Sequence, residues 1–434
     1  MIDLHALSAG EAARRIAAGS LTAEALTRAM LDRVELRDGT VHAFEHLDPE
    51  AALAAARTID RSDAKGPLRG VPIGVKDLMD TADMPTAYGS PIYRGWRPRA
   101  DAAVVALARA AGAVVLGKTA TTEFATFHAG TTTNPHDARH TPGGSSSGSA
   151  AAVADRMVPL AIGSQTAGSV IRPAAFCGVV GYKPTFGLIP RAGTKLIAES
   201  LDTIGVFARS VADAALFAGV LTGRPGLHEA ATPGDLGQAS IELGLCRTHQ
   251  WPLAAPETVA LFERLPEMLA RGGLRPETVE ATEDHRPLFA AQVAIMGREA
   301  AGALAWEWTT HAADLSSQLR DLLAAGAAVT PGEYDRAQQQ ALEARRAMPA
   351  FFGTHDAVIV PAAPGEAPEG LAYTGDPAFS RIWTLLGVPC VSLPAGTGPG
   401  SLPLGIQLVG RIGDDARLLA VAAVVERALA VALR

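Results

Sequence analysis

Short apolar runs alternate with Ala-rich segments along the first half of this chain, and no other feature constrains its fold as strongly. The expected buried strands are residues 71–76, 113–116, 158–163 and 179–182. Helices are expected between them at 102–111, with Asp101 as N-cap and Gly112 as its stop, and at 149–156. Such an alternation builds a sheet with helices on its faces, which predicts an α/β fold.

Apolar runs return near the end of the chain, after a middle stretch that is mainly helical in pattern. The late strands are expected at 357–360, 388–393 and 406–409, before a final helix over about 414–433. The Pro-, Gly- and Thr-rich residues 224–237 predict a long connection. We find no internal repeat and expect the late strands to join the early ones in one sheet, which favours a single large domain.

The composition excludes several classes of function. The chain has 434 residues, 48% of them hydrophobic, and a net charge of −7 without a cluster of Lys and Arg, which argues against a nucleic-acid surface. No signal-peptide core and no run of about 20 apolar residues is visible, so we expect a cytoplasmic protein without a membrane partner. Its three cysteines are widely spaced, which disfavours a disulfide framework or a zinc knuckle.

Residues 142–150 form a Gly-Gly-Ser-Ser-Ser-Gly loop with a helix behind it. Paired glycines permit backbone geometry that other residues resist, and the serines would bring hydroxyl and N–H groups together. A polar loop that caps a helix remains an alternative. A phosphate-binding P-loop is rejected, because Ser149 and Ala150 stand where its Lys and Ser/Thr should follow.

Residues 163–174 place small residues directly before Ser169, after an expected strand. Consecutive backbone N–H groups in such a tight turn can stabilise an oxyanion. A serine in this position can attack a carbonyl carbon if a base removes its proton.

Together these segments resemble the amidase signature family. Ser169 follows Ser145 by 24 residues, as in the family motif, and Lys76-Asp77 ends a strand of the family type. Further matching segments are 181–185, 201–205 and 404–410. The resemblance implies a single α/β domain with a mixed, twisted sheet sandwiched between helices. It divides the chain into an N-terminal helical layer (1–65), a signature core (66–215), a divergent substrate wall (225–350) and C-terminal strands with a helix (351–434).

The resemblance also implies the catalytic roles. Ser169 would be the nucleophile, Ser145 a bridging serine held by a cis peptide bond, and Lys76 the general base. The backbone N–H groups of Thr166, Ala167, Gly168 and Ser169 would form the oxyanion hole. Two departures put the surrounding hydrogen bonds in question: Gln165 replaces the usual Asp, and Arg172 follows the nucleophile by three residues instead of two.

The chemistry is consistent without the family. A lysine with an ordinary pKa of about 10.4 is a cation and accepts no proton, so Lys76 must become neutral near pH 8. This requires a pKa shift of about two units, or roughly 2.7 kcal/mol. Burial in the apolar strand favours the neutral form, and the positive end of the helix after Ser147 acts in the same direction.

Other candidate residues have alternative interpretations. Lys118 is a rival base but is expected to snorkel or pair with Glu123. His136 and His140 have the spacing of a metal pair only on a helix, which the flanking prolines disfavour, so no metal site is predicted. His128 lacks the context of a Ser-His-Asp triad. Cys177 is expected to be a buried, inert thiol.

The predicted function is hydrolysis of a small soluble carboxamide through an acyl-enzyme, without a cofactor. Gly144, Ser146, His128 and Trp383 are the expected substrate contacts, and Trp306, Trp308 and Tyr334 are further possible walls or core residues. One alternative is the glutaminase-type A subunit of an aminoacyl-tRNA amidotransferase, which works with partner chains. A second is a catalytically silent binding protein of the same fold. A homodimer is possible.

Overall fold

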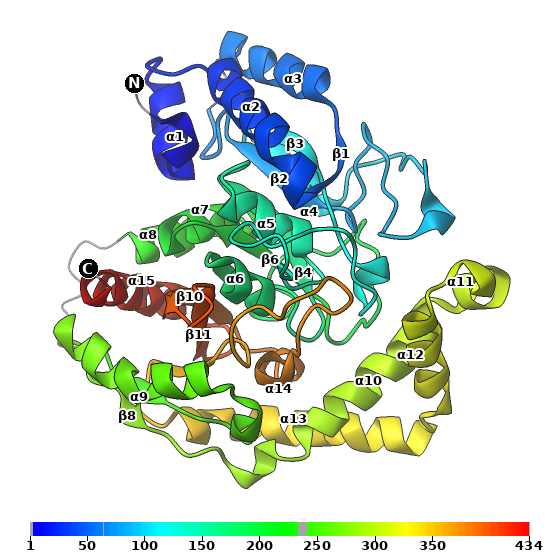
Figure 1. Cartoon of the computed structure of the whole chain (residues 1–434), viewed down its shortest axis with the longest axis vertical. Coiled ribbons are helices and arrows are strands. Elements are labelled where there is room, and N and C mark those ends of the chain that lie inside the picture. The colour runs from blue at the N-terminus through cyan, green and yellow to red at the C-terminus, as the bar shows by residue number, and fades with distance from the viewer. Residues whose placement is uncertain (1–2, 64, 233–240, 434) are drawn as a thin grey trace.

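Strands from both halves of the chain pair within one sheet in the computed structural model, which describes residues 3–63, 65–232 and 241–433 (Figure 1). The strands are β1 (Phe44–Leu47), β2 (Pro72–Lys76), β3 (Val114–Thr119), β4 (Leu160–Gln165), β5 (Val180–Lys183), β6 (Thr203–Ala208), β7 (Leu243–Leu245), β8 (Glu277–Thr278), β9 (Ala357–Pro361), β10 (Cys390–Thr397) and β11 (Pro403–Gly410). Within these residues the sheet has 11 strands in the order β1-β3-β2-β4-β6-β5-β10-β11-β9-β7-β8.

The sheet is mixed, as expected. β2 pairs in parallel with both β3 and β4, whereas β4, β6, β5, β10, β11 and β9 follow one another in antiparallel pairs. The early and late strands meet where β5 pairs with β10, with Tyr182 opposite Val391. This pairing joins both halves of the chain in one sheet and confirms the predicted single-domain α/β fold.

Helices surround the sheet (Figure 1). They are α1 (Ala9–Ala17), α2 (Ala23–Val41), α3 (Pro49–Arg61), α4 (Ala103–Ala110), α5 (Ser147–Ala154), α6 (Ile171–Cys177), α7 (Val211–Thr222), α8 (Gly226–Ala231), α9 (Pro256–Arg271), α10 (Leu288–Ala303), α11 (Ala305–Thr310), α12 (Ser317–Ala328), α13 (Pro331–Phe352), α14 (Ala378–Leu385) and α15 (Asp415–Ala432). In Figure 1 the helices α10 to α13 form an arm at the edge of the molecule, away from α1 to α3.

Two neighbouring residues of β5 show that helices cover both faces of the sheet. A Cβ on Gly181 would lie 2.6 Å from the Cβ of Ala174 in α6. The hydroxyl of the next residue, Tyr182, donates to the Asp415 carboxylate in α15 at 2.5 Å. Because successive side chains of a strand point to opposite faces, α6 and α15 lie on opposite sides of the sheet.

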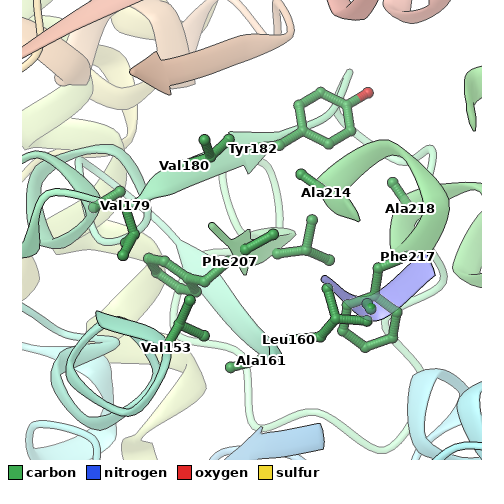
Figure 2. Packing of buried hydrophobic residues seen from close by; sticks show 14 of the residues in the cluster. Val153, Leu160, Ala161, Val179, Val180, Tyr182, Phe207, Ala214, Phe217 and Ala218 are labelled. Atoms are coloured by element: carbon green, nitrogen blue, oxygen red, sulfur yellow. The ribbon is translucent and has the colours of Figure 1, made fainter. Parts of the chain in front are cut away.

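The largest buried cluster fills the space between the sheet and these helices. Figure 2 shows part of it, where Phe207 of β6 and Phe217 of α7 lie among aliphatic side chains of β4, β5 and α5. All of the residues of β2, β4, β5 and β6 are buried, which is expected for strands covered on both faces. Aromatic residues are few, so small aliphatic side chains make up most of this core.

The local structure differs from the sequence expectation in three places. Asp101 does not cap α4: its carboxylate accepts from the Ala82 N–H at 2.8 Å and pairs with Arg109, while Ala102 takes the N-cap position. The expected connection 224–237 contains the helix α8, and its residues 233–237 lie outside the described part. β1, β6 and β8 are not among the strands expected from the sequence.

No helix of the described residues is both long and apolar enough to cross a membrane.

Glu426 of α15 supplies a test of the packing between α15 and α7. Its carboxylate accepts from the Val211 N–H at 3.0 Å, and burial, with the charge of Asp213 acting in the same direction, raises its pKa to about 7. Protonated Glu426 favours the folded state, because its pKa is higher there than the unfolded value of 4.5. This contribution to stability is complete below pH 4.5 and is lost as the pH rises through about 7.

The substitution Glu426→Gln keeps the hydrogen-bond acceptor and removes the charge. We therefore expect its melting temperature to exceed that of the wild type by a few degrees at pH 8 and to match it near pH 4.5, measured by calorimetry; a difference independent of pH would contradict the assignment.

Candidate active site

Lys76 is fully buried at the carboxyl end of β2, between the two parallel neighbours of that strand. Its Nζ donates to Ser145 Oγ at 2.7 Å and to Ser164 Oγ at 2.9 Å. No carboxylate forms an ion pair with this ammonium among the described residues. The expected Lys76–Ser145 contact is therefore present, and Ser164 is a further partner that sequence reasoning did not identify.

Ser145 lies in the glycine-rich loop directly before α5. The Gly144–Ser145 peptide bond is cis, in agreement with the family resemblance, and Gly143 has a φ of +82°, which favours glycine. Gly144 has no room for a side chain, since a Cβ would lie 2.8 Å from Cγ2 of Thr374. Its carbonyl accepts from Arg172 Nη2 at 2.6 Å. The loop is thus fixed from the side of α6.

Ser169 lies in the turn between β4 and α6, and 7% of its surface is exposed. It lines a small cavity. Within the described part of the chain its Oγ makes no hydrogen bond, so the transfer of a proton between Ser169 and Ser145 remains a prediction.

The carbonyl groups of the turn before Ser169 all accept hydrogen bonds, two of them from distant segments. Gln292 Nε2 donates to the Thr166 carbonyl at 3.0 Å, and Thr384 Oγ1 donates to the Ala167 carbonyl at 2.8 Å. The Gly168 carbonyl accepts from the N–H of Arg172 at 2.9 Å. The N–H groups of Ala167, Gly168 and Ser169 have no acceptor among the residues the structure describes, which leaves them available to an oxyanion.

Gln165 fixes the start of α6 in place of the usual carboxylate. Its Oε1 accepts from the N–H groups of Val170 at 2.8 Å and Ile171 at 3.0 Å, and its Nε2 donates to Thr384 Oγ1 at 2.9 Å. A carboxylate could accept the two N–H bonds but could not donate to the hydroxyl. Both polar atoms of the Gln165 side chain therefore form hydrogen bonds in this site.

Burial lowers the pKa of Lys76 to about 7, while the negative charge of Asp202 opposes this shift. The direction agrees with the sequence prediction and the cause is the predicted one, loss of hydration. Asp202 itself accepts from the Thr166 hydroxyl and from the N–H groups of Ile197 and Ala198. A lysine with this pKa is largely neutral slightly above pH 7 and can accept a proton.

Lys118, the rival base, lies beside Lys76 on β3, but its surroundings differ. Its Nζ pairs with Asp77 Oδ1 at 3.0 Å and donates to Thr86 Oγ1 at 2.6 Å. The prediction that Lys118 pairs with Glu123 is wrong, because the Glu123 carboxylate accepts instead from the N–H of Ser316. Lys118 is therefore a buried partner of Asp77, and among the described residues it makes no hydrogen bond with Ser145 or Ser169.

The cavity beside Ser169 has mainly apolar walls. Its lining residues are Ala125, Thr126, Phe127, Thr166, Ala167, Ser169, Arg172, Ile197, Met296, Leu322 and Pro377. Met296 and Leu322 come from α10 and α12, so the divergent region 225–350 does contribute to the wall. A larger apolar hollow between α4, α7 and α8 has none of the predicted catalytic residues in its lining.

The aromatic residues expected in this wall lie elsewhere. Trp306 is 51% exposed, and Tyr334 donates its hydroxyl to Glu299. Trp308 packs against a separate apolar cluster. None of the three is among the residues that line the cavity.

Of the four expected substrate contacts, none is a lining residue of the cavity. Trp383 is fully buried and packs against His285 and Phe351, with ring centroids 5.7 Å away in both cases, so it belongs to the core. Ser146 Oγ donates to the Ser164 carbonyl at 3.2 Å and supports β4. His128 has an exposed side chain, and Gly144 presents its carbonyl to Arg172.

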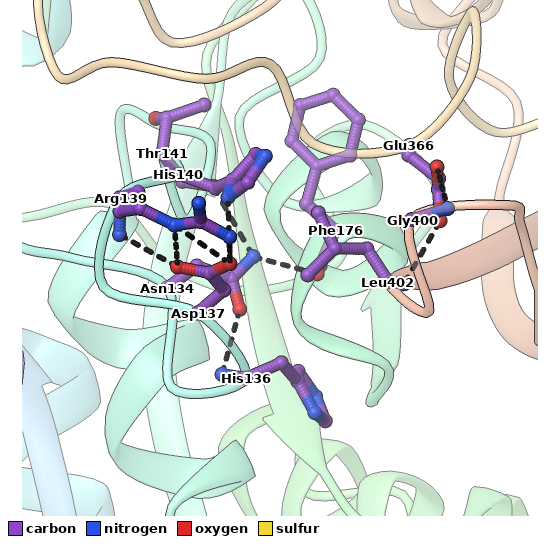
Figure 3. A network of polar contacts seen from close by, with 10 residues as sticks. All are labelled: Asn134, His136, Asp137, Arg139, His140, Thr141, Phe176, Glu366, Gly400 and Leu402. Atoms are coloured by element: carbon purple, nitrogen blue, oxygen red, sulfur yellow. Dashed lines mark hydrogen bonds and ion pairs between the residues drawn. The ribbon is translucent and has the colours of Figure 1, made fainter.

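His136 and His140 do not form a metal pair. The segment between them is not helical, and Figure 3 shows their rings on different sides of a polar network centred on Asn134 and Asp137. His136 Nε2 lies 3.0 Å from the Cys177 carbonyl, whereas His140 Nδ1 lies 3.4 Å from Asp137. Cys177 is buried, and burial raises the pKa of its thiol, which suits an inert residue.

The chain matches known proteins over almost its whole length. The Amidase family model matches residues 25–419. The A subunit of the glutamyl-tRNA(Gln) amidotransferase of Salinispora arenicola is 36% identical, and the match covers 99% of this chain and 98% of that protein.

Solved structures agree in fold. The peptide amidase of Stenotrophomonas maltophilia superposes with a TM-score of 0.82 at 29% identity, covering 97% of this chain and 96% of that one. A chain from a vestigial protein complex, connected with the origin of an s-triazine catabolic enzyme, has a TM-score of 0.88 at 29% identity and covers 97% and 98%. The chain therefore belongs to the amidase signature family of enzymes, which act on carbon–nitrogen bonds.

Proposed function

We propose that this enzyme hydrolyses a small soluble carboxamide to a carboxylate and ammonia or an amine, with Ser169 as nucleophile. The observation that carries the proposal is the buried Lys76, which has a pKa of about 7 and donates to Ser145 Oγ at 2.7 Å. A base with this pKa near the working pH is well suited to general acid–base catalysis.

In the proposed reaction, Ser169 Oγ attacks the amide carbon while its proton passes to Ser145 and the Ser145 proton passes to neutral Lys76. The carbonyl oxygen becomes an oxyanion, which the N–H groups of Ala167, Gly168 and Ser169 stabilise. When the C–N bond breaks, Lys76 returns its proton through Ser145 to the leaving nitrogen. A water molecule then attacks the acyl-enzyme by the same relay and releases the carboxylate and Ser169.

A second candidate function has specific support. Curated relatives at 34–36% identity include A subunits of glutamyl-tRNA(Gln) amidotransferases, and these alignments span nearly all of each protein. In that alternative the chain would release ammonia from glutamine within a complex. The solved relatives include amidases, and the net charge of −7 offers little attraction to tRNA, so we favour the amidase acting on a small molecule.

A catalytically silent binding protein is the remaining alternative. A binding protein has no need for an unpaired buried lysine, which costs free energy of folding. We propose a cytoplasmic enzyme that needs no cofactor and no metal ion, alone or as a homodimer. Covalent labelling of Ser169 by a fluorophosphonate would separate this enzyme from a silent protein.

The pH profile tests Lys76 as the base. Below a pKa of about 7 the neutral fraction of Lys76 falls tenfold per pH unit, so we expect kcat/KM for an amide to decrease in the same way on the acid side and to level off above pH 8. Asp202→Asn removes the negative charge that favours the ammonium form, and its acid limb should therefore move to lower pH. Steady-state kinetics from pH 5 to 9 measure the acid limb of the wild type and of the variant. An acid limb at the same pH in both enzymes would show that the Asp202 charge does not act on Lys76.

Variants of the relay test the proton path. Ser169→Ala and Lys76→Ala should remove nearly all amidase activity, and Ser145→Ala should cost at least a factor of about 100. Lys76→Ala should impair amides more than matched esters, because an alkoxide leaves with less help than an amine. Rates of ammonia and alcohol release measure this contrast. Equal losses on both substrates would show that Lys76 does not return its proton to the leaving group.

A substrate panel separates the two candidate functions. The cavity walls are apolar, with Phe127, Ile197, Met296 and Leu322 among them, so short aliphatic or aryl amides should be better substrates than free glutamine or asparagine. The order of preference is measured as kcat/KM for each amide of the panel. The purified protein is also examined for partner chains that copurify with it. A kcat/KM for glutamine above that of every other amide would favour the amidotransferase alternative.

A further inference from the structure

Each N–H group that would bind the oxyanion shares a peptide unit with a carbonyl that accepts a hydrogen bond. In a planar peptide unit the carbonyl of one residue and the N–H of the next turn together. A bond to the Ala167 carbonyl therefore orients the N–H of Gly168. Among the described residues this carbonyl accepts only from Thr384 Oγ1, at 2.8 Å. The direction of the Gly168 N–H thus depends on a single hydroxyl group.

Thr384 lies in α14, outside the cavity. Only 1% of its surface is exposed, and it is not a lining residue. The start of α14 packs against the turn, since a Cβ on Gly168 would lie 2.8 Å from the Cβ of Pro377 and 3.1 Å from that of Ser380. The Ser380 carbonyl is a second acceptor for the Thr384 hydroxyl at 3.1 Å, farther away than the Ala167 carbonyl. Any effect of Thr384 on the reaction must therefore pass through the backbone of the turn.

Gln165 determines the direction in which the Thr384 hydroxyl donates. Its Oε1 accepts from the N–H groups of Val170 and Ile171, so the atom that lies 2.9 Å from Thr384 Oγ1 is the donor Nε2. The hydroxyl has one proton, and because it accepts from Gln165 this proton is left for a carbonyl. A carboxylate in place of the amide would attract the proton, and the Ala167 carbonyl would lose its donor.

We propose that Thr384, oriented by Gln165, is a positioning residue of the oxyanion hole. The bonds from the Gln165 amide to the Thr384 hydroxyl, and from this hydroxyl to the Ala167 carbonyl, hold the Gly168 N–H in the direction of the oxyanion. A donor that is fixed before the reaction need not reorient as the negative charge develops. This inference rests on the proposed amidase function and adds to it two residues that do not line the cavity.

The substitution Thr384→Val tests the role of the hydroxyl, because it keeps the branched shape of the side chain. Removal of a whole oxyanion donor lowers kcat about 100- to 1,000-fold, and a donor that is present but not held should cost less. We expect kcat for propionamide to fall about 10- to 100-fold with KM nearly unchanged, as for a contact made only in the transition state. Thr384→Ser keeps the hydroxyl and should restore kcat to within a few-fold of the wild type.

Thr132→Val is the matched control. Thr132 is also buried, and its hydroxyl donates to the His42 carbonyl at 2.8 Å, so this variant loses the same kind of bond away from the site. Its kinetics should equal those of the wild type. Melting temperatures of all the variants show which of them fold.

A trifluoromethyl ketone measures the stabilisation of the oxyanion directly. Ser169 Oγ adds to the carbonyl carbon of trifluoromethyl ethyl ketone, a propionamide analogue, and the hemiketal oxygen occupies the oxyanion hole. Fluorine NMR at different pH values gives the pKa of this hemiketal. Thr384→Val should raise that pKa by about one unit for each tenfold loss of kcat, whereas Thr384→Ser and Thr132→Val should leave it unchanged. An unchanged pKa in a folded Thr384→Val, or equal losses in the Val and Ser variants, overturns the proposal.

The substitution Gln165→Glu tests the orientation of the hydroxyl. A glutamate still accepts from the N–H groups of Val170 and Ile171, but its carboxylate attracts the Thr384 proton away from Ala167. The loss of kcat should resemble that of Thr384→Val, and the double variant should be little worse than either single variant. Losses that multiply would contradict the coupling, because independent residues behave in that way. If Thr384→Val does not fold, the hemiketal pKa of Gln165→Glu decides the question.

Fluorophosphonate labelling separates this inference from the proposed function. The phosphoryl oxygen enters the same oxyanion hole, so the labelling rate of Ser169 should fall in Thr384→Val together with kcat, whichever amide is the substrate. If wild-type Ser169 is not labelled and no amide is turned over, the proposed function fails and this inference fails with it. If the wild type is labelled and a folded Thr384→Val is labelled at the same rate, the proposed function stands and only the positioning role fails.

Discussion

The burial of the Lys76 ammonium without a carboxylate partner is the constraint on which the site depends. Lys118 provides the internal comparison, since Val75 is its register partner on the neighbouring strand and burial lowers the pKa of both lysines. Lys118 has Asp77 at 3.0 Å, which opposes the shift, whereas Lys76 has only the hydroxyls of Ser145 and Ser164. Two lysines on neighbouring strands thus have different electrostatic surroundings, because among the described residues only Lys118 has a counter-ion.

The turn before Ser169 depends on a second set of contacts, which converge from distant parts of the chain. Gln292 of α10 and Thr384 of α14 hold the carbonyls of Thr166 and Ala167, and Gln165 holds the first N–H groups of α6. With the carbonyls bound, the neighbouring N–H groups remain free. Buried polar networks whose members are satisfied are rigid, and rigidity is what an oxyanion site requires.

The same network connects the turn with the cavity wall. Gln292 donates to the turn and accepts from Arg381, while Arg172 reaches from α6 to the carbonyl before Ser145. The turn, the glycine-rich loop and the cavity wall are thus connected by hydrogen bonds.

Much of the fold follows from the sequence, because the signals involved are local. Short apolar runs predicted β2, β3, β4, β5, β9, β10 and β11 to within a few residues, and Ser8 and Thr22 cap α1 and α2. The order of the motifs predicted the family and the contact between Lys76 and Ser145. Asp101 was misassigned because a tertiary contact to Ala82 competes with capping. β1 was missed because its pattern of burial is irregular.

Only the tertiary structure decided what surrounds the predicted catalytic residues. Trp383 resembles a pocket residue in the sequence, yet the packing of α14 directs it into the core. Gln292, Thr384 and Arg381 carry no motif, and their contacts are with residues up to 219 positions away. The sequence by itself determined the fold class, the family and the Lys–Ser–Ser motif, because periodicity and spacing are local properties. The counter-ions, the free N–H groups and the charge of the cavity depend on which distant side chains meet, and packing alone settles that.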